Sequence, residues 1–227
     1  MDAMGFLYTP LPLWVAVGGW AIAALVLTLA LLQRPFRRLQ DGTLQHVWLA
    51  IIVAISVLWA TNAWLDDGPV MRLLGATLLV TLFDWALALV AMALVSGVAA
   101  LVFDAAWHGV ALTFLIYGAM PVGVSALLQR ACTAWLPRNL FAFICAQGFV
   151  SPAIAVTVAG VAAAATHIAL ADGSSAVVPV GYAFSVFLLA VGEAWFTGMS
   201  TALIAVYKPT WVTTNDVRRY RLGGPRT

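Results

Sequence analysis

The chain has 227 residues, of which 63% are hydrophobic and 9% are charged, and its formal net charge is +2. An ordinary soluble domain carries roughly 25% charged residues, so this composition excludes a water-soluble globular fold and indicates an integral membrane protein in a lipid bilayer. The basic residues near the end of the chain are better explained as a membrane-face anchor than as a nucleic-acid surface.

Apolar segments follow one another along the chain. Five of them are long enough to cross about 30 Å of hydrocarbon as helices: 12–32, 46–65, 110–129, 139–169 and 175–207. A further apolar stretch, 70–103, contains Asp84. It is either one helix or two shorter helices, about 71–83 and 85–103, that meet near Asp84.

The distribution of basic residues decides between these two interpretations. Apart from Arg72, every Lys and Arg falls in one of three clusters: Arg34/Arg37/Arg38, Arg130/Arg138 and Lys208/Arg218/Arg219/Arg221/Arg226. Basic loops stay on the cytoplasmic side, and only two helices in 70–103 put all three clusters there. Acidic residues then fall outside: Asp66, Asp67, Asp104 and Asp172.

The predicted fold is therefore an all-α, seven-span bundle with one short or broken span. Its N-terminus is outside and its C-terminus is cytoplasmic, in the inner (cytoplasmic) membrane of a bacterium. Residues 1–210 form one transmembrane domain, and 211–227 form a basic cytoplasmic tail. Short or broken membrane segments are tolerated where they line a cavity or are buried in protein, which favours a binding site there.

Glu193 is the only glutamate and lies in the middle of an apolar segment. An ionisable group inside a membrane marks a functional site by default. The alternative is a structural role, in which Glu193 accepts hydrogen bonds from nearby backbone or from Thr197. In either role we expect Glu193 to face the bundle interior.

Asp104 and His108 are spaced by four residues, so they share one face if that turn is helical. A carboxylate and an imidazole could ligate a metal, and the alternative is a hydrogen-bonded pair at the membrane surface. Small residues recur in 148–165 and 192–200. They indicate close helix packing within the chain or, alternatively, a surface for a partner helix.

Motifs for common catalytic chemistries are absent from the sequence, which has no P-loop, HExxH, CxxC or nucleophile elbow. The sequence thus predicts no catalytic residue and no enzyme activity, and it identifies no certain cofactor, with a divalent metal possible as a substrate. Energised transport would need a separate ATPase or coupling module.

Three segments carry a family resemblance. The chain opens with MDAMGFL at 1–7, continues with NAWLDDGPVMRLLG at 62–75, and has GEAWFTG at 192–198 followed by Tyr207-Lys208-Pro209. These resemble the MHIxxGFL opening, the NFPVPGGTSGHLLG stretch and the EGLITG helix of the CbiM/NikM family, the substrate-binding membrane components of energy-coupling-factor cobalt and nickel transporters. The resemblance implies seven spans with an external N-terminus.

The resemblance also implies a metal site, held by the N-terminal amine, by the His at the second position and by the His of GHLLG. This chain has Met1 and Asp2 at its start and Arg72 at the GHLLG position. Arginine stays protonated and cannot be a ligand. Either Arg72 replaces the metal charge and pairs with Asp2, or it is an exposed residue at a helix end. The middle motif DGGL is replaced by DAAWHG at 104–109.

Two functions follow from these expectations. The first is a CbiM-like binding component that takes up a divalent transition metal or another small solute, with Met1, Asp2, Arg72 and Glu193 as substrate-binding residues and Asp104 and His108 as second-choice metal ligands. The second is a non-transporting accessory subunit of a larger membrane complex, which keeps the scaffold without the ligand.

Overall fold

The computed structural model describes residues 11–40, 42–60, 72–135, 140–170, 181–208 and 211–212. Within these ranges the regular elements are all helical. They are α1 (Leu13–Leu32), η1 (Pro35–Gln40), α2 (Gly42–Ala60), α3 (Ala76–Phe83), α4 (Trp85–Val102), α5 (Trp107–Thr113), η2 (Phe114–Ala119), α6 (Met120–Trp135), α7 (Leu140–Phe143), η3 (Ile144–Val150), α8 (Ser151–Leu170) and α9 (Tyr182–Tyr207).

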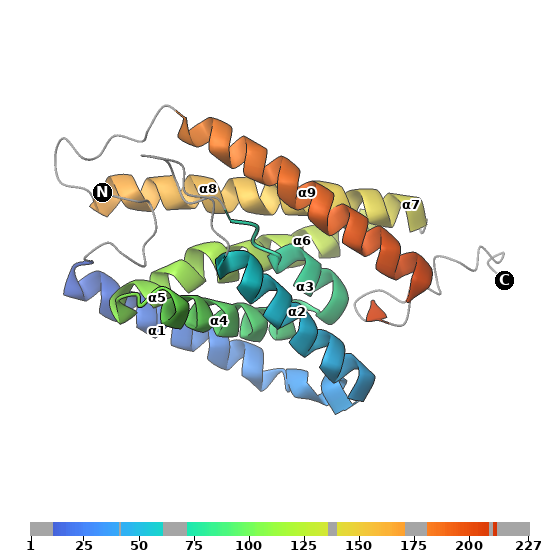
Figure 1. The fold of residues 1–227 in the computed structure, drawn as a ribbon, viewed down its shortest axis with the longest axis horizontal. Helices are drawn as coiled ribbons and strands as arrows, with labels where there is room; N and C mark the ends of the chain where they lie inside the picture. The colour runs from blue at the N-terminus through green and yellow to red at the C-terminus, as the bar shows by residue number, and fades with distance from the viewer. Residues whose placement is uncertain are drawn as a thin grey trace.

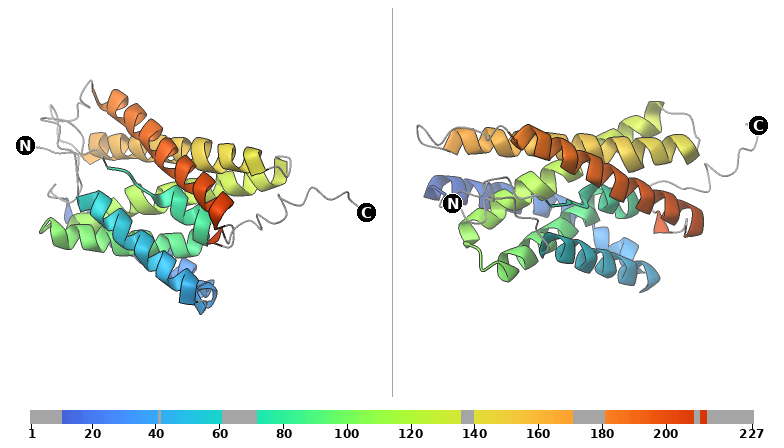
Figure 2. Two further views of the ribbon diagram at one scale, coloured as in Figure 1. Left: turned by 45° about the vertical axis from the view of Figure 1, so that its right-hand side comes forward. Right: turned by 45° about the horizontal axis from the view of Figure 1, so that its top comes forward.

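The helices form an elongated bundle whose long members run roughly along one direction (Figures 1 and 2). In the described ranges six helical stretches are long and apolar enough to cross a membrane: Leu13–Leu32, Gly42–Ala60, Trp85–Val102, Trp107–Trp135, Leu140–Leu170 and Tyr182–Tyr207. Many large apolar side chains on these helices face outward, as expected where lipid replaces water as the solvent. The chain is thus an all-α protein of the multi-pass membrane type.

Residues 72–103, the described part of this stretch, contain two helices rather than one, as the charge distribution predicts. α3 ends at Phe83 and α4 begins at Trp85. Between them Asp84 has φ 79° and ψ 162°, a conformation that residues with a Cβ rarely adopt. Its carboxylate accepts a hydrogen bond of 2.8 Å from the backbone N–H of Trp85, which caps α4 and fixes the reversal of the chain.

The predicted helix 71–83 is wrong at its beginning. Residues 72–75 are not helical, and α3 starts only at Ala76. Gly75 has φ 68°, which breaks the helix because a left-handed residue cannot continue it. The eight residues of α3 span about 12 Å, so α3 alone is too short to cross a bilayer.

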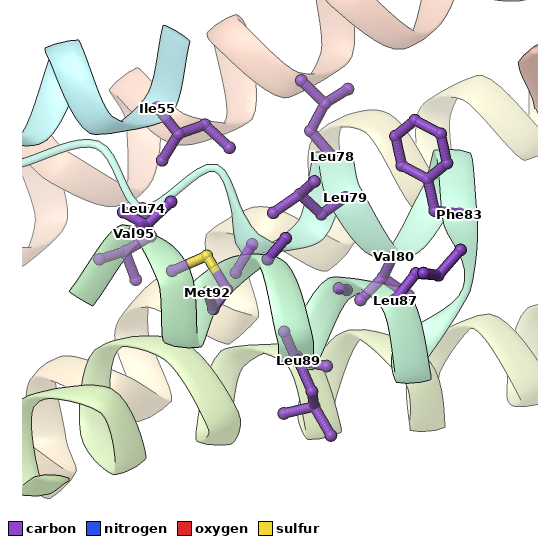
Figure 3. Close-up of a cluster of buried hydrophobic side chains, with 14 of the residues drawn as sticks. Ile55, Leu74, Leu78, Leu79, Val80, Phe83, Leu87, Leu89, Met92 and Val95 are labelled. Carbon is purple, nitrogen blue, oxygen red and sulfur yellow. The ribbon is translucent and has the colours of Figure 1, made fainter. Parts of the chain in front are cut away.

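α3 is buried on all sides, and none of its residues is more than 5% exposed. It contacts α4, α6, α8 and α9. Figure 3 shows a cluster of buried apolar side chains that come from α2, from the segment before α3, from α3 and from α4: Ile55, Leu74, Leu78, Leu79, Val80, Phe83, Leu87, Leu89, Met92 and Val95. The core of the bundle is therefore built around a short helix that itself has no lipid-facing side.

Two long helices each contain a π turn in the described ranges. The N–H of Met120 bonds to the carbonyl of Leu115, and the N–H of Ser151 bonds to that of Ala146, each five residues back. Pro121 and Pro152 follow directly. A proline ring clashes with the carbonyl four residues earlier, and a π turn moves that carbonyl away. The two prolines explain why these helices widen where they do.

Small residues bring η3 and α8 close to α9, which confirms the expected packing within the chain. A Cβ built on Gly160 would lie 2.8 Å from Val186, and one on Gly148 would lie 3.0 Å from the Cα of Gly198. The hydroxyl of Tyr182 also donates a 2.7 Å hydrogen bond to the carbonyl of Gly160. In lipid such close backbone contact is a main source of helix association.

Candidate functional site

Glu193 lies at the centre of the candidate site, on the face of α9 that is turned toward α3. Its side chain is 1% exposed, although the helix around it is apolar. A carboxyl group in this surrounding is costly unless it is hydrogen-bonded. The prediction that Glu193 faces the interior is confirmed.

The hydrogen-bond partners of Glu193 come from the extended segment before α3. The N–H of Leu74 donates to Oε2 over 2.8 Å, and the N–H of Gly75 donates to Oε1 over 2.6 Å. The first N–H groups near a helix start lack partners within the helix and bear partial positive charge. Glu193 thus receives two donors, and it fixes the position where α3 begins.

The other proposed partner of Glu193, the Thr197 hydroxyl, makes no hydrogen bond within the described part of the chain. The expectation that Glu193 accepts from Thr197 is therefore wrong, and the alternative of a backbone donor is correct. The reason is geometric: Leu74 and Gly75 present two N–H groups side by side, which match the two carboxyl oxygens.

Gly75 supplies more than one of these donors. Its left-handed φ of 68° turns the chain into α3, and a side chain there would require Ile55 to move. A Cβ at this position would lie 2.7 Å from Cδ1 and 2.9 Å from Cγ1 of Ile55 in α2. A glycine is therefore favoured both by the backbone angle and by the close approach of the Ile55 side chain.

Arg72 lies buried at the start of the same extended segment, with 7% of its surface exposed. Its guanidinium carbon is 5.0 Å from the centre of the Trp59 ring, which is fully buried at the end of α2. This is a cation–π contact. The interpretation of Arg72 as an exposed residue at a helix end is therefore wrong.

No family model, curated protein or solved structure matches this chain. The site therefore has to be interpreted from its own geometry. That geometry joins two segments that lie far apart in sequence, 72–75 and α9, through the two hydrogen bonds of Glu193.

The remaining predicted site residues lie elsewhere. Met1 and Asp2 fall outside the described residues, so the pairing of Asp2 with Arg72 stays a prediction. Asp104 has φ 48° in the turn between α4 and α5, and His108 lies in the first turn of α5. They do not share a helical face, because the turn between them is not helical. No group of three potential metal-ligating side chains occurs in the described ranges.

Several buried polar side chains near α3 were not predicted from the sequence. The hydroxyls of Thr77 in α3 and Ser125 in α6 are 2.7 Å apart and hydrogen-bonded. Gln147 in η3 and Thr201 in α9 are at most 1% exposed. A spacing of four residues on α9 links Thr201 to Thr197 and Glu193, and this pattern could have indicated Thr201. The sequence has no comparable signal for Thr77, Ser125 or Gln147.

A separate groove of about 430 Å³ lies between α8 and α9. Its lining is almost entirely apolar and includes Phe149, Phe187 and Trp195. The one hydroxyl in it, on Thr157, donates 2.8 Å to the carbonyl of Ala153. This groove offers no converging polar groups, unlike the surroundings of Glu193.

Proposed function

We propose that this protein is a CbiM-like, substrate-binding membrane component of an energy-coupling transporter, without enzyme activity of its own. It sits in the inner membrane of a bacterium with seven crossings, the segment 72–83 forming the irregular one, and it works with a separate ATPase or coupling module. Its substrate is a divalent transition metal or another small solute.

The observation that carries this proposal is the contact between Glu193 and the N–H groups of Leu74 and Gly75. This contact joins two of the three segments that resemble the family. They are RLLG at 72–75 and GEAWFTG at 192–198. A discontinuous membrane segment whose helix start is buried near the middle of a bundle is a common feature of solute sites in transporters. The resemblance is a property of the sequence and the contact is a property of the fold, so each supports the proposal separately.

The buried Arg72 argues against a metal substrate, so it favours either another small solute or the second candidate, a non-transporting accessory subunit. The Arg72 side chain is buried, and its fixed positive charge lies over the Trp59 ring. The resemblance implies a metal-ligating imidazole at this position. A divalent cation bound close to this guanidinium would be repelled by it, and in a low-dielectric interior such repulsion is strong. A solute other than a metal, or none, fits this position better.

The first experiment that tests the proposal identifies the bound metal and the partner chains together. The full chain is purified from its own membrane under mild detergent, and metal content and co-purifying proteins are measured by mass spectrometry. A bound metal or solute in a complex with an ATPase supports the transport component. A stable assembly with unrelated membrane subunits and no ligand overturns it in favour of the accessory role.

A second experiment restores the imidazoles of the family. The double variant Asp2→His with Arg72→His is compared with each single variant for binding of Ni(II) and Co(II). If the scaffold is that of the family, the double variant gains metal binding that neither single variant shows. A double variant that folds and binds no metal contradicts the family assignment. Asp104→Ala in the double variant is the control and leaves binding unchanged.

A further inference from the structure

Near the crossing of η3 and α9 the described part of the chain has four buried polar side chains, in η3, at the start of α8 and in α9, whose hydrogen-bonding capacity is not used. Gln147 and Ser151 contribute from one side, Thr197 and Thr201 from the other, and each is at most 1% exposed. Within the described ranges, both amide atoms of Gln147 and the three hydroxyl oxygens have no hydrogen-bond partner. We refer to these four residues as the polar crossing.

Gln147 and Thr201 lie beside the point where the two helices come closest, and Ser151 and Thr197 each lie four residues from one of them. A Cβ on Gly148 would lie 3.0 Å from the Cα of Gly198 and 3.5 Å from the Cβ of Thr201. Thr201 therefore lies next to Gly148, the residue that follows Gln147 in η3. Thr197 directly precedes Gly198 in α9. The two glycines bring the helices together, and polar residues flank both of them.

The threonine hydroxyls of the polar crossing differ in their hydrogen bonding from several other threonine hydroxyls of the chain. Thr81, Thr157 and Thr166 each donate to the carbonyl four residues earlier in their own helix, over 2.7 to 2.9 Å. This is the usual way to satisfy a hydroxyl in a membrane helix. Thr197 and Thr201 make no such bond, so their hydroxyls remain available to another group.

Polar groups at this depth need a partner. Native proteins hydrogen-bond nearly all of their buried polar side-chain atoms to protein or to ordered water, and hydrocarbon supplies no substitute. All four side chains are uncharged and include both donors and acceptors. A bound ion would find no counter-charge among them, whereas water can donate to the hydroxyls and to the amide oxygen and accept from the amide nitrogen.

We propose that the polar crossing is an internal water site, in which ordered water molecules bridge the Gln147 amide to the hydroxyls of Ser151, Thr197 and Thr201. The inference does not depend on the proposed transport function. It has a consequence for the candidate site, because Glu193, Thr197 and Thr201 follow one another at intervals of four residues on α9. The water extends the polar environment of Glu193 toward the C-terminal end of that helix.

Water-edited solid-state NMR on the full chain in lipid bilayers tests the inference directly. Magnetisation transferred from water should reach the side-chain nitrogen of Gln147 faster than the backbone amides of Leu79 and Val80 in the dry core of α3. The exposed side chain of Gln45 serves as the wet reference. A transfer rate at Gln147 equal to that of the α3 amides would overturn the proposal.

Isosteric variants give an independent readout. Thr201→Val removes one hydroxyl from the polar crossing, and Thr157→Val is the matched control because that hydroxyl bonds within its own helix. If water is bound, Thr201→Val slows the transfer to Gln147 and lowers the unfolding temperature by about 3 °C relative to the control. If the crossing is dry, Thr201→Val is as stable as the control or more so, because an unused polar group has been removed.

Discussion

Glu193 accepts a 2.6 Å hydrogen bond from the backbone N–H of Gly75, a residue 118 positions earlier in the chain. The donor is a main-chain group near a helix start and the acceptor is a buried carboxyl group in the middle of the longest single α-helix of the described chain. The contact holds the irregular segment 72–75 against α9, and several predictions concern its strength.

Replacing Glu193 with glutamine should destabilise the protein by about 1–3 kcal/mol, because an amide has a single acceptor oxygen and turns a donor toward the second N–H. Glu193→Leu should cost more, since both N–H groups are then buried without partners. Chemical denaturation of the two variants in the same detergent measures the difference. Equal losses in both variants would show that the charge itself, rather than hydrogen bonding, is required.

Gly75→Ala should destabilise the protein through two separate effects, the left-handed backbone angle and the clash with Ile55. The angle costs about 1–2 kcal/mol in any background, whereas the clash depends on Ile55. In the background of Ile55→Ala, the substitution at Gly75 should therefore cost less than in the wild type. Unfolding free energies of the four proteins in this cycle provide the measurement, and additive effects would argue against the clash.

Asp84 combines an unfavourable backbone angle with a cap on α4. Asp84→Ala should lose about 1 kcal/mol from the missing cap and keep the unfavourable angle. Asp84→Gly also loses the cap but relieves the angle, so we expect it to be the more stable of the two. A glycine variant that unfolds more easily than the alanine variant would contradict this account of the helix break.

The arrangement of the helices predicts which ends share a membrane face. The C-terminal ends of α1, α6 and α9 lie toward the same end of the bundle (right in Figure 1), and the described basic residues at or near them are Arg34, Arg130 and Lys208. Asp104 follows α4 at the opposite end. From the positive-inside rule we expect the basic end to be cytoplasmic.

Single cysteines at these positions test the prediction, in a background where Cys132 and Cys145 are replaced by alanine. A membrane-impermeant maleimide added to sealed inverted vesicles should label Arg34→Cys and Arg130→Cys and leave Asp104→Cys unlabelled. Labelling of positions 34 and 104 from the same face would exclude seven crossings.

The charge pair between Asp2 and Arg72 is also open to experiment. The sequence predicts it because both expected imidazole positions change together, one to an acid and the other to a base. Removing one charge of a buried pair costs several kcal/mol, whereas the pair together is close to neutral. Asp2→Ala and Arg72→Ala should each destabilise the protein, and the double variant should lose less than their sum. Strictly additive losses would rule out the pair.

The sequence predicts the long helices because each depends on the length of its own apolar segment. It predicts the break at Asp84 because the basic clusters share one membrane face only if 70–103 forms two helices. It also predicts the interior position of Glu193, since a buried carboxyl group inside lipid leaves few alternatives. The start of α3 is different. Its position depends on the φ angle of Gly75 and on the space left by Ile55, which no pattern in the segment reveals.

The partners of Glu193 could not be predicted for a related reason. They are backbone N–H groups, which every residue except proline possesses, so the side chains of Leu74 and Gly75 carry no signal for this role. The π turns are another matter, because Pro121 and Pro152 inside long apolar segments were a visible indication that the helices there could not remain regular.

The burial of α3 on all sides has a consequence for biogenesis. An eight-residue apolar helix is too short to be inserted as an independent unit, and its surroundings include α9, which leaves the ribosome last among the long helices. The support that Glu193 gives to residues 74 and 75 does not exist until then. Residues 72–83 therefore reach their final position only after α9 has been synthesised. Although they belong to the first half of the chain, they are enclosed by a helix from its second half.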